Sequence, residues 1–192
     1  RPVALGAMTP NDEFPHTSPD PIADPQGYQR HLLELLGDDD PAAVQTATPR
    51  EWHTMIDVAG AKVHLAPAEG EWSVFGCLAH AVDAEIVMSA RYRWILAHDE
   101  PPLLGYDQDL WVQRLHADPD AEPSADLLAA LAALRRTNLA LWRRSTERER
   151  ARVGVHDERG PESFDLSFRM IAGHDRFHLR QARETLEALA AG

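Results

Sequence analysis

The sequence predicts an all-α protein, a four-helix bundle with long crossover connections. Four long segments carry apolar residues at helical spacing, and almost no stretch alternates apolar and polar residues as a half-buried strand does. A chain of 192 residues, 44% of them hydrophobic, is also long enough to bury one real core. We therefore expect a single helical-bundle domain over residues 25–192, preceded by a proline-rich extension over residues 1–24.

The first long helix is expected to begin near Pro25, since proline suits the first turn of a helix, and to end at Gly37. A shorter helical stretch should cover residues 49–58, where Trp52 belongs to the apolar side. Residues 59–72 contain glycine and proline and are expected to form a loop.

The second long helix should begin at Ser73, whose hydroxyl can cap the first turn, and continue to about His98. Two consecutive prolines then stop it, and a loop follows. This loop carries Tyr106 and Trp111, the aromatic residues that we expect closest to an opening.

The third long helix is expected to run from residue 124 to about residue 148, and the fourth from Ser163 to the end of the chain. Between them, residues 149–162 are rich in arginine and bounded by glycine, which indicates a connection. The loops after the first and second long helices are each long enough to span the bundle, so short turns do not dictate the topology.

The charge balance excludes several classes of partner. Lysine and arginine number 19 against 31 aspartates and glutamates, a formal net charge of −12. Nucleic acids and anionic membrane surfaces attract clustered basic residues, so neither is an expected partner. No apolar run approaches the roughly 20 residues of a membrane span, and one cysteine cannot build an internal disulfide framework. The first residues lack the pattern of a secretory signal, so we expect a cytoplasmic protein that binds a small molecule.

Two histidines of the fourth helix share one face. His174 and His178 are four residues apart, which places them about 40° apart around the helix axis and one turn along it. The face around them is mostly apolar and should point into the bundle. Two imidazoles at this spacing can bind one metal ion, although the rings can also simply pack or reach water.

A third histidine, His80, lies on a mostly apolar face of the second long helix. A buried imidazole needs a partner for its ring nitrogens. If the second and fourth helices are neighbours, His80 can meet His174 and His178, and three protein ligands would leave coordination positions open, as in a catalytic site. Zinc, nickel and iron all suit imidazole ligands. A buried histidine satisfied by other groups remains the alternative.

These motifs together resemble the DinB-like superfamily, which includes the YfiT group. The resemblance covers about residues 25–190 and depends on the order and spacing of short pieces: Gly70-Glu71-Trp72-Ser73, then His80, Asp83 and Glu85, then His174-Asp175 with His178-Leu179 and Gln181. It implies a four-helix bundle with a long crossover and, frequently, a homodimer. It also implies one divalent metal ion held by His80, His174 and His178.

The activities that the resemblance implies are diverse. Some members resemble transferases that join a low-molecular-weight thiol to an electrophile, and others resemble thiol-dependent isomerases or metal-dependent hydrolases. We expect a metal-dependent enzyme that activates a low-molecular-weight thiol cosubstrate for transfer to an electrophilic small molecule. A metal-dependent hydrolase, a non-catalytic metal- or ligand-binding module of the stress response, and a structural dimer whose histidines merely pack are the alternatives.

Two polar side chains are candidates for catalytic roles beside the metal. Asp83 lies one turn from His80 and about 60° around the helix, so it is expected to orient a ligand or act as a base. Glu85 lies about 140° away and is interpreted as a solvated or salt-bridged carboxylate. Gln181 follows His178 by three residues and can bond substrate or water, or pack in the core with its amide satisfied.

Arg91 is the candidate for binding the thiol cosubstrate, because it can hold a carboxylate of that molecule, and Arg135 is a second possibility. A surface or interhelix salt bridge is nevertheless the favoured interpretation of both arginines. Cys77 precedes His80 by three residues and can approach the same metal, but a lone helical cysteine is more often a small buried hydrophobe.

Overall fold

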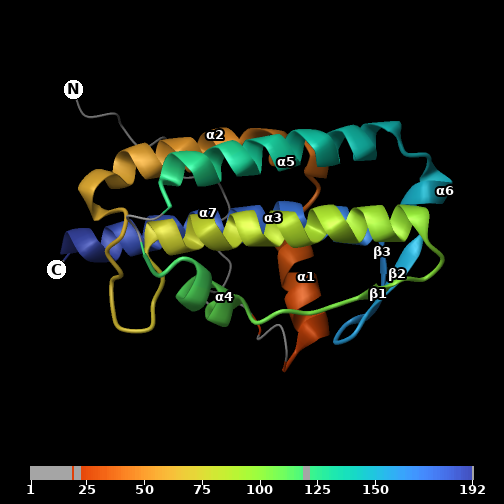
Figure 1. Cartoon of the computed structure of the whole chain (residues 1–192), viewed down its shortest axis with the longest axis horizontal. Coiled ribbons are helices and arrows are strands. Elements are labelled where there is room, and N and C mark those ends of the chain that lie inside the picture. Colours follow the sequence, from red (N-terminus) through yellow and green to blue (C-terminus); the bar gives the residue numbers. More distant parts are fainter. Residues whose placement is uncertain (1–18, 20–22, 119–121, 192) are drawn as a thin grey trace.

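Four long helices form a bundle in the computed structural model, which describes residue 19 and residues 23–118 and 122–191; two of them run in one direction and two in the other (Figure 1). They are α2 (Pro41–Ala59), α3 (Val74–Ala97), α5 (Ser124–Arg144) and α7 (Phe164–Ala191). Helices α3 and α5 pack on each other. Helix α7 packs on α3, α2 packs on α5, and α2 and α7 also pack on each other. The predicted helical bundle is therefore confirmed. The expected extension over residues 1–24 lies almost wholly outside the described residues.

Helix α1 (Pro25–Leu36) is not one of the four but stands across the bundle and packs on α7 (Figure 1). The crossing is so close that a Cβ atom added at Gly173 would lie 1.9 Å from the carbonyl oxygen of Leu32. Arg176 of α7 also donates hydrogen bonds to the last carbonyl oxygens of α1, at 2.8 Å for Leu35 and 3.0 Å for Leu36. Glycine at position 173 is thus required by this contact.

The fourth bundle helix is α2, and the expectation of a short helix over residues 49–58 is wrong about where it begins. Asp40 accepts a hydrogen bond from the backbone N–H of Ala42, and Pro41 occupies the first turn. Pro49 lies inside this 19-residue helix instead of at its beginning. Packing against α5 and α7 holds the helix together across a residue that cannot donate a backbone hydrogen bond.

Helix α3 begins as predicted, with the Ser73 hydroxyl accepting from the backbone N–H of Gly76 at 3.1 Å. The long connection that follows it is not only a loop. It contains β1 (Pro102–Leu103) and a short helix, α4 (Gln108–Leu115), whose first turn is capped by Asp107. Helix α4 packs on α3, so this connection covers part of the bundle.

The connection between α5 and α7 also has structure that the sequence did not indicate. Helix α5 ends at Arg144, and a four-residue helix, α6 (Glu147–Arg150), precedes the strands β2 (Val153–His156) and β3 (Gly160–Ser163). Strand β2 pairs in parallel with β1 and antiparallel with β3, so that three short strands form one sheet. The sheet buries His156 and Glu162 on the bundle side.

A buried ionic network ties the four bundle helices together. Arg135 of α5 donates to both carboxylate oxygens of Asp175 in α7, at 2.6 Å and 3.0 Å, and its second nitrogen lies 3.0 Å from Glu85 of α3. Thr48 of α2 donates to the same carboxylate of Asp175 at 2.9 Å. Burial raises the pKa of Glu85 to about 7 although Arg135 opposes the change. Glu85 and Arg135 are therefore salt-bridged, and the solvated alternative for Glu85 is wrong.

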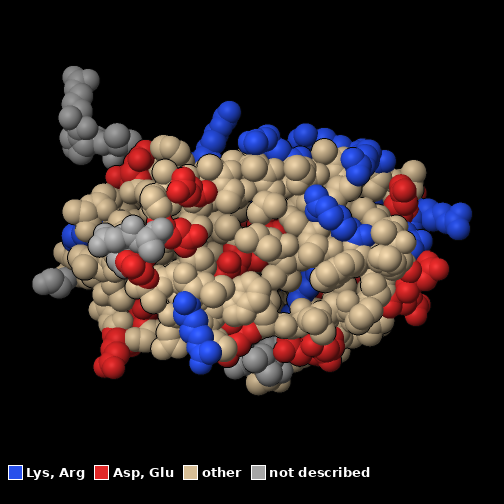
Figure 2. Space-filling view, viewed as in Figure 1, with Lys and Arg blue, Asp and Glu red and all other residues tan. Residues whose placement is uncertain are grey.

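The apolar core surrounds this network. Cys77 is fully buried within it, and burial raises the pKa of its thiol to about 12. None of the described helices is both long and apolar enough to cross a membrane. On the surface, basic side chains gather along the edge where α5 and α6 lie (Figure 2).

Candidate metal centre

Three histidines from two helices meet inside the bundle. The Nε2 atom of His174 lies 3.0 Å from Nε2 of His80 and 3.1 Å from Nε2 of His178. All three side chains are buried, and each contributes one ring nitrogen to a group of three nitrogen atoms that lie within 4.8 Å of one another. The two histidines of α7 and the histidine of α3 are brought together as the sequence predicts, because α3 and α7 are neighbours.

The spacing of these nitrogen atoms fits a bound metal ion. Two imidazole nitrogens that each lie about 2.1 Å from one ion in a tetrahedral arrangement are about 3.4 Å apart, and the distances observed here are within a few tenths of an ångström of that value. The tautomer of His178 also favours a bound metal ion. The oxygen of Gln181 lies 2.8 Å from Nδ1 of His178, so that Nδ1 carries the proton and Nε2 presents a lone pair to the cluster.

Without a cation the cluster would leave lone pairs in contact. Burial lowers the pKa of His178 to about 4 and holds the pKa values of His80 and His174 well below 6.5. All three rings are therefore neutral at pH 7. Nε2 of a neutral His174 carries at most one hydrogen and cannot donate to both neighbours, while its Nδ1 is buried without a partner in the described structure. A metal ion at the shared point resolves this arrangement.

Trp72 covers the histidine cluster from outside. Its ring centroid lies 5.0 Å from that of His80 and 5.9 Å from that of His178. The backbone carbonyl of Trp72 accepts a hydrogen bond from Thr185 of α7 at 3.3 Å, which fixes this segment to the bundle. The sulfur of Cys77 is not among the atoms that gather here, so the expectation of a small buried hydrophobe fits its position.

The structure does not bring Asp83 to the cluster. Its carboxylate lies 3.0 Å from Nε2 of His116, at the end of α4, and His116 in turn lies 2.5 Å from Glu122. The angular offset from His80 turns Asp83 toward α4 instead of α7. Its contacts therefore do not support the expected role as a base or orienting group, whereas Gln181 contacts a histidine of the cluster directly.

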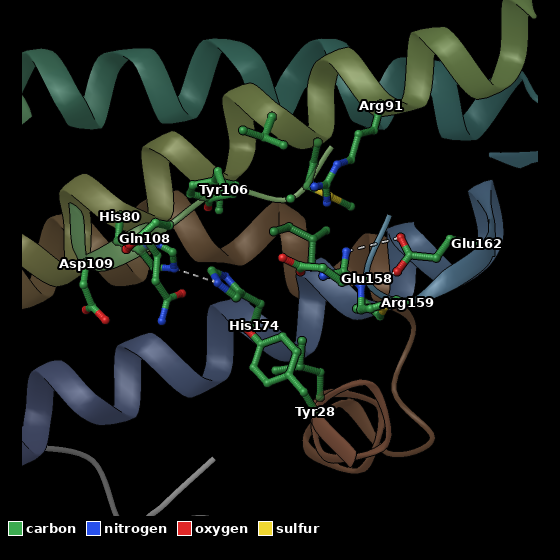
Figure 3. Close-up of a pocket in the computed structure, with 18 residues that line it drawn as sticks. Tyr28, His80, Arg91, Tyr106, Gln108, Asp109, Glu158, Arg159, Glu162 and His174 are labelled. Atoms are coloured by element: carbon green, nitrogen blue, oxygen red, sulfur yellow. Dashed lines mark hydrogen bonds and ion pairs between the residues drawn. The ribbon is translucent and has the colours of Figure 1, made fainter. Parts of the chain in front are cut away.

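A pocket of about 270 Å³ extends from the cluster between α1, α3, α4, α7 and the sheet. His80 and His174 lie at one end, and Arg91, Arg159 and Glu162 lie at the other (Figure 3). Tyr106 lines it as expected, and the ring of Trp111 packs against that of Tyr106 at a tilt of 41°, with the ring centroids 4.4 Å apart. No lining residue comes from α5 or α6, so the pocket is separate from the basic edge in Figure 2.

Sequence reasoning missed the contribution of α4 to the pocket. Gln108 and Asp109 from its first turn lie beside His80 (Figure 3). The available signal was Asp107, an N-cap residue followed by an acidic first turn, but eight residues are too few for a clear helical period.

Arg91 lies in the wall of the pocket and is 4% exposed. Its NH2 group donates to the carbonyl oxygen of Leu104 and lies 3.0 Å from Nε2 of His156. Its NH1 group contacts only the sulfur of Met88, at 3.7 Å, and its Nε has no hydrogen-bond partner among the described residues. The favoured expectation of a salt bridge is wrong for Arg91, since no carboxylate in the described part of the chain pairs with it.

Comparisons with known proteins agree with this fold. A protein of Oceanobacillus iheyensis named putative metal-dependent hydrolase OB0413 is 23% identical over 143 residues, which cover 74% of this chain and 81% of that protein. The structure of YfiT from Bacillus subtilis, described as a probable metal-dependent hydrolase with an unusual four-helix bundle topology, superposes with a TM-score of 0.67. That match has 17% sequence identity and covers 97% of this chain and 95% of YfiT, so it shows a shared fold. Residues 29–182 match the DinB superfamily, and the chain belongs to that superfamily.

Proposed function

We infer that His80, His174 and His178 hold one divalent metal ion and that the protein is a metal-dependent enzyme acting on a small molecule. The observation that carries this conclusion is the convergence of three neutral imidazole nitrogens, 3.0 Å and 3.1 Å apart, beside a pocket. A divalent ion held there would lower the pKa of a water or thiol that reaches it, and so supply a nucleophile at neutral pH.

The residues of the chain have separate tasks in this proposal. The three histidines supply the ligands and leave further coordination positions for substrate, because no carboxylate or thiolate of the described residues completes the group. Gln181 fixes the tautomer of His178. Trp72 and Tyr106 cover His80 and limit the access of bulk water.

Thiol transfer is the first candidate reaction. It follows from the resemblance of the sequence motifs, and a pocket with apolar walls and a buried arginine suits a small thiol that bears an acid group. In such a reaction the thiolate sulfur bonds to the electrophilic carbon, the leaving group departs with the electron pair, and the thiol proton passes to solvent.

Hydrolysis is the second candidate, and the names of the two similar proteins favour it. The two candidates differ in whether turnover requires a thiol. Metal-loaded protein should be assayed with an activated aryl chloride plus a thiol, and with a nitrophenyl ester without a thiol. Turnover of the aryl chloride with the thiol, but not of the ester, supports transfer. Turnover of the ester, but not of the chloride, supports hydrolysis. No turnover of either substrate favours a non-catalytic binding module.

Metal content is the measurement that tests the proposal first. Untagged protein should contain about one equivalent of zinc, nickel or iron by elemental analysis, and His174→Ala should lose it. His53→Ala is the matched control, since His53 is an exposed histidine of α2 that pairs only with Asp57. Wild-type protein that remains metal-free after incubation with all three ions would overturn the proposal.

The cellular setting is also a proposal. A cytoplasmic location, a homodimer and a role in the stress response remain predictions from the sequence and its resemblance. Size-exclusion chromatography with light scattering measures the oligomeric state directly.

A further inference from the structure

No carboxylate of the described residues lies within ion-pair distance of the buried guanidinium of Arg91, although Glu162 and Asp157 act on its charge from farther away. Among the described residues its partners are a carbonyl oxygen, an imidazole nitrogen and a thioether sulfur, all of them neutral acceptors. Burying an unpaired charge is costly, so such groups in folded proteins are paired or serve a ligand. Arg91 also points into the pocket that begins at the histidine cluster (Figure 3).

The sheet holds Arg91 in this position. Nε2 of His156 lies 3.0 Å from the NH2 group of Arg91, and Nδ1 on the other side of the ring accepts from the backbone N–H of Glu158 at 3.2 Å and lies 3.1 Å from Asp157. Asp157 therefore lies on the far side of the ring and binds His156, not the guanidinium. The carbonyl oxygen of Leu104 and the ring of His156 fix where the NH2 group points, and Nε–H and the NH1 hydrogens have no oxygen or nitrogen acceptor in the described structure.

The other charged residues of the pocket do not form an ion pair with Arg91. Arg159 and Glu162 pair with each other, and Gln29 also donates to Glu162 at 2.9 Å, so this pair contributes no net charge. Asp107 caps α4, and Asp109 and Glu158 are exposed. One positive charge thus remains inside, with acids at the surface, which suits a ligand that carries a single negative charge.

We propose that Arg91 binds the carboxylate of an elongated monoanionic ligand whose other end reaches the histidine cluster. The two ends of this site lie on one helix, because Arg91 follows His80 by eleven residues of α3, or about 16 Å along the axis. The walls between them include the apolar side chains of Leu32, Val87, Met88, Met170 and Ile171. The ligand class is therefore a chain-like acid with an apolar middle and a reactive group opposite its carboxylate.

Only the second half of this inference, the contact with the metal, rests on the proposed function. The carboxylate site can be tested without a metal, using octanoate and its neutral analogue octanamide. Calorimetry on the full-length protein, as purified and again after treatment with a chelator, should show octanoate binding at least tenfold more tightly than octanamide in both states. Equal binding of the two compounds, or no binding of octanoate, would overturn the inference.

Substitutions locate the charge that is responsible. Arg91→Gln should weaken octanoate binding roughly ten- to hundredfold and leave octanamide unchanged, whereas Arg91→Lys should retain part of the preference for the acid. Arg93→Gln is the matched control, because Arg93 is exposed on the same helix and does not line the pocket. Equal losses in Arg91→Gln and Arg93→Gln would also contradict the proposal. The comparison of octanoate with octanamide in wild-type protein decides the matter even if Arg91→Gln fails to fold.

A third series tests the two ends together. Cobalt-loaded protein should be titrated with mercaptocarboxylates of increasing chain length and with the matching mercaptoamides, while the sulfur-to-cobalt absorption band is recorded. An optimum in chain length for the acids, absent in Arg91→Gln, supports a ligand that spans the pocket. A band of equal strength for acids and amides would leave the metal site standing and overturn the carboxylate site. Absence of the band with intact octanoate binding would overturn the metal contact instead.

Discussion

Arg135 and Arg91 are both almost fully buried, and they differ in what surrounds them. Arg135 faces two carboxylates, Asp175 and Glu85, which raise its pKa above the usual value despite burial. Arg91 has only neutral groups within hydrogen-bond distance, and burial, followed by Arg159, lowers its pKa although Glu162 and Asp157 oppose the change. Nε of each arginine is buried without a hydrogen-bond partner in the described structure, so the two differ in whether carboxylates pair with the charge.

The difference distinguishes structural polar groups from those available to a ligand. The network around Arg135 uses one side chain from each bundle helix, so it fixes how the helices pack. The histidine cluster and Arg91 are alike in leaving buried nitrogen atoms unpaired on the side of a pocket. Unpaired buried atoms also occur away from the pocket, Nε of Arg135 among them, so what distinguishes Arg91 is a charge without a paired carboxylate that lines a pocket.

The largest expected effect is on the free energy of unfolding, which should fall much more when Arg135 is replaced than when Arg91 is replaced. Arg135→Met leaves Asp175 and Glu85 buried without a cation and should lower the free energy of unfolding by about 3–5 kcal/mol. Arg91→Met leaves only neutral acceptors and should cost less than about 2 kcal/mol. Urea unfolding of the metal-free proteins measures both values. Equal losses would show that Arg91 has a structural partner comparable with that of Arg135.

A smaller effect is expected for Gln181, whose side chain contacts His178 of the histidine cluster. Gln181→Leu removes the acceptor for Nδ1 of His178 and should weaken metal affinity roughly 10- to 100-fold. Gln181→Glu keeps an acceptor at the same place and is the matched control. Competition with a chromophoric chelator measures the affinity. Unchanged affinity in Gln181→Leu would contradict the role assigned to Gln181.

The smallest effect concerns Asp83 and depends on pH. Burial alone would lower the pKa of His116, but its bonds to Glu122 and Asp83 outweigh burial and raise the pKa above 6.5. The stability from protonated His116 is therefore lost as the pH rises through the raised pKa of His116, and burial also raises the pKa of Asp83, so that acid removes the charge of the carboxylate. Asp83→Asn should lose about 1 kcal/mol or less at pH 6, and less again at pH 9, by urea unfolding. The metal content of Asp83→Asn should equal that of the wild type. Loss of the metal would show that Asp83 does support the metal centre.

The sequence predicts the helices that begin with a clear cap. Ser73 and Ser163 precede α3 and α7 as expected, and each accepts a hydrogen bond from the first turn of its helix. Pro49 was misleading because a proline that suits a first turn is also tolerated inside a helix packed on both sides. The strands were missed since each has at most four residues, and the pairing of β1 with β2 joins segments about fifty residues apart.

The site is predictable where it depends on spacing along one helix and not where it depends on tertiary contacts. The pairing of His174 with His178 follows from the helical period, and the motif order adds His80. The partners of Asp83 and Arg91 are His116 and His156, which come from connections that carry no periodic signal. A side chain at a helix face can turn to either neighbour, and only the packed structure decides which.

Cys77 is the chain's one cysteine, and its burial and raised pKa make it unreactive in the folded protein. The protein therefore carries no nucleophilic sulfur that would compete with an added thiol or be alkylated by an electrophilic substrate. Colorimetric thiol assays should count only the cosubstrate while the chain is folded. Any labelling of Cys77 would then report the fraction of molecules that have opened, so the same reagent can follow both turnover and inactivation.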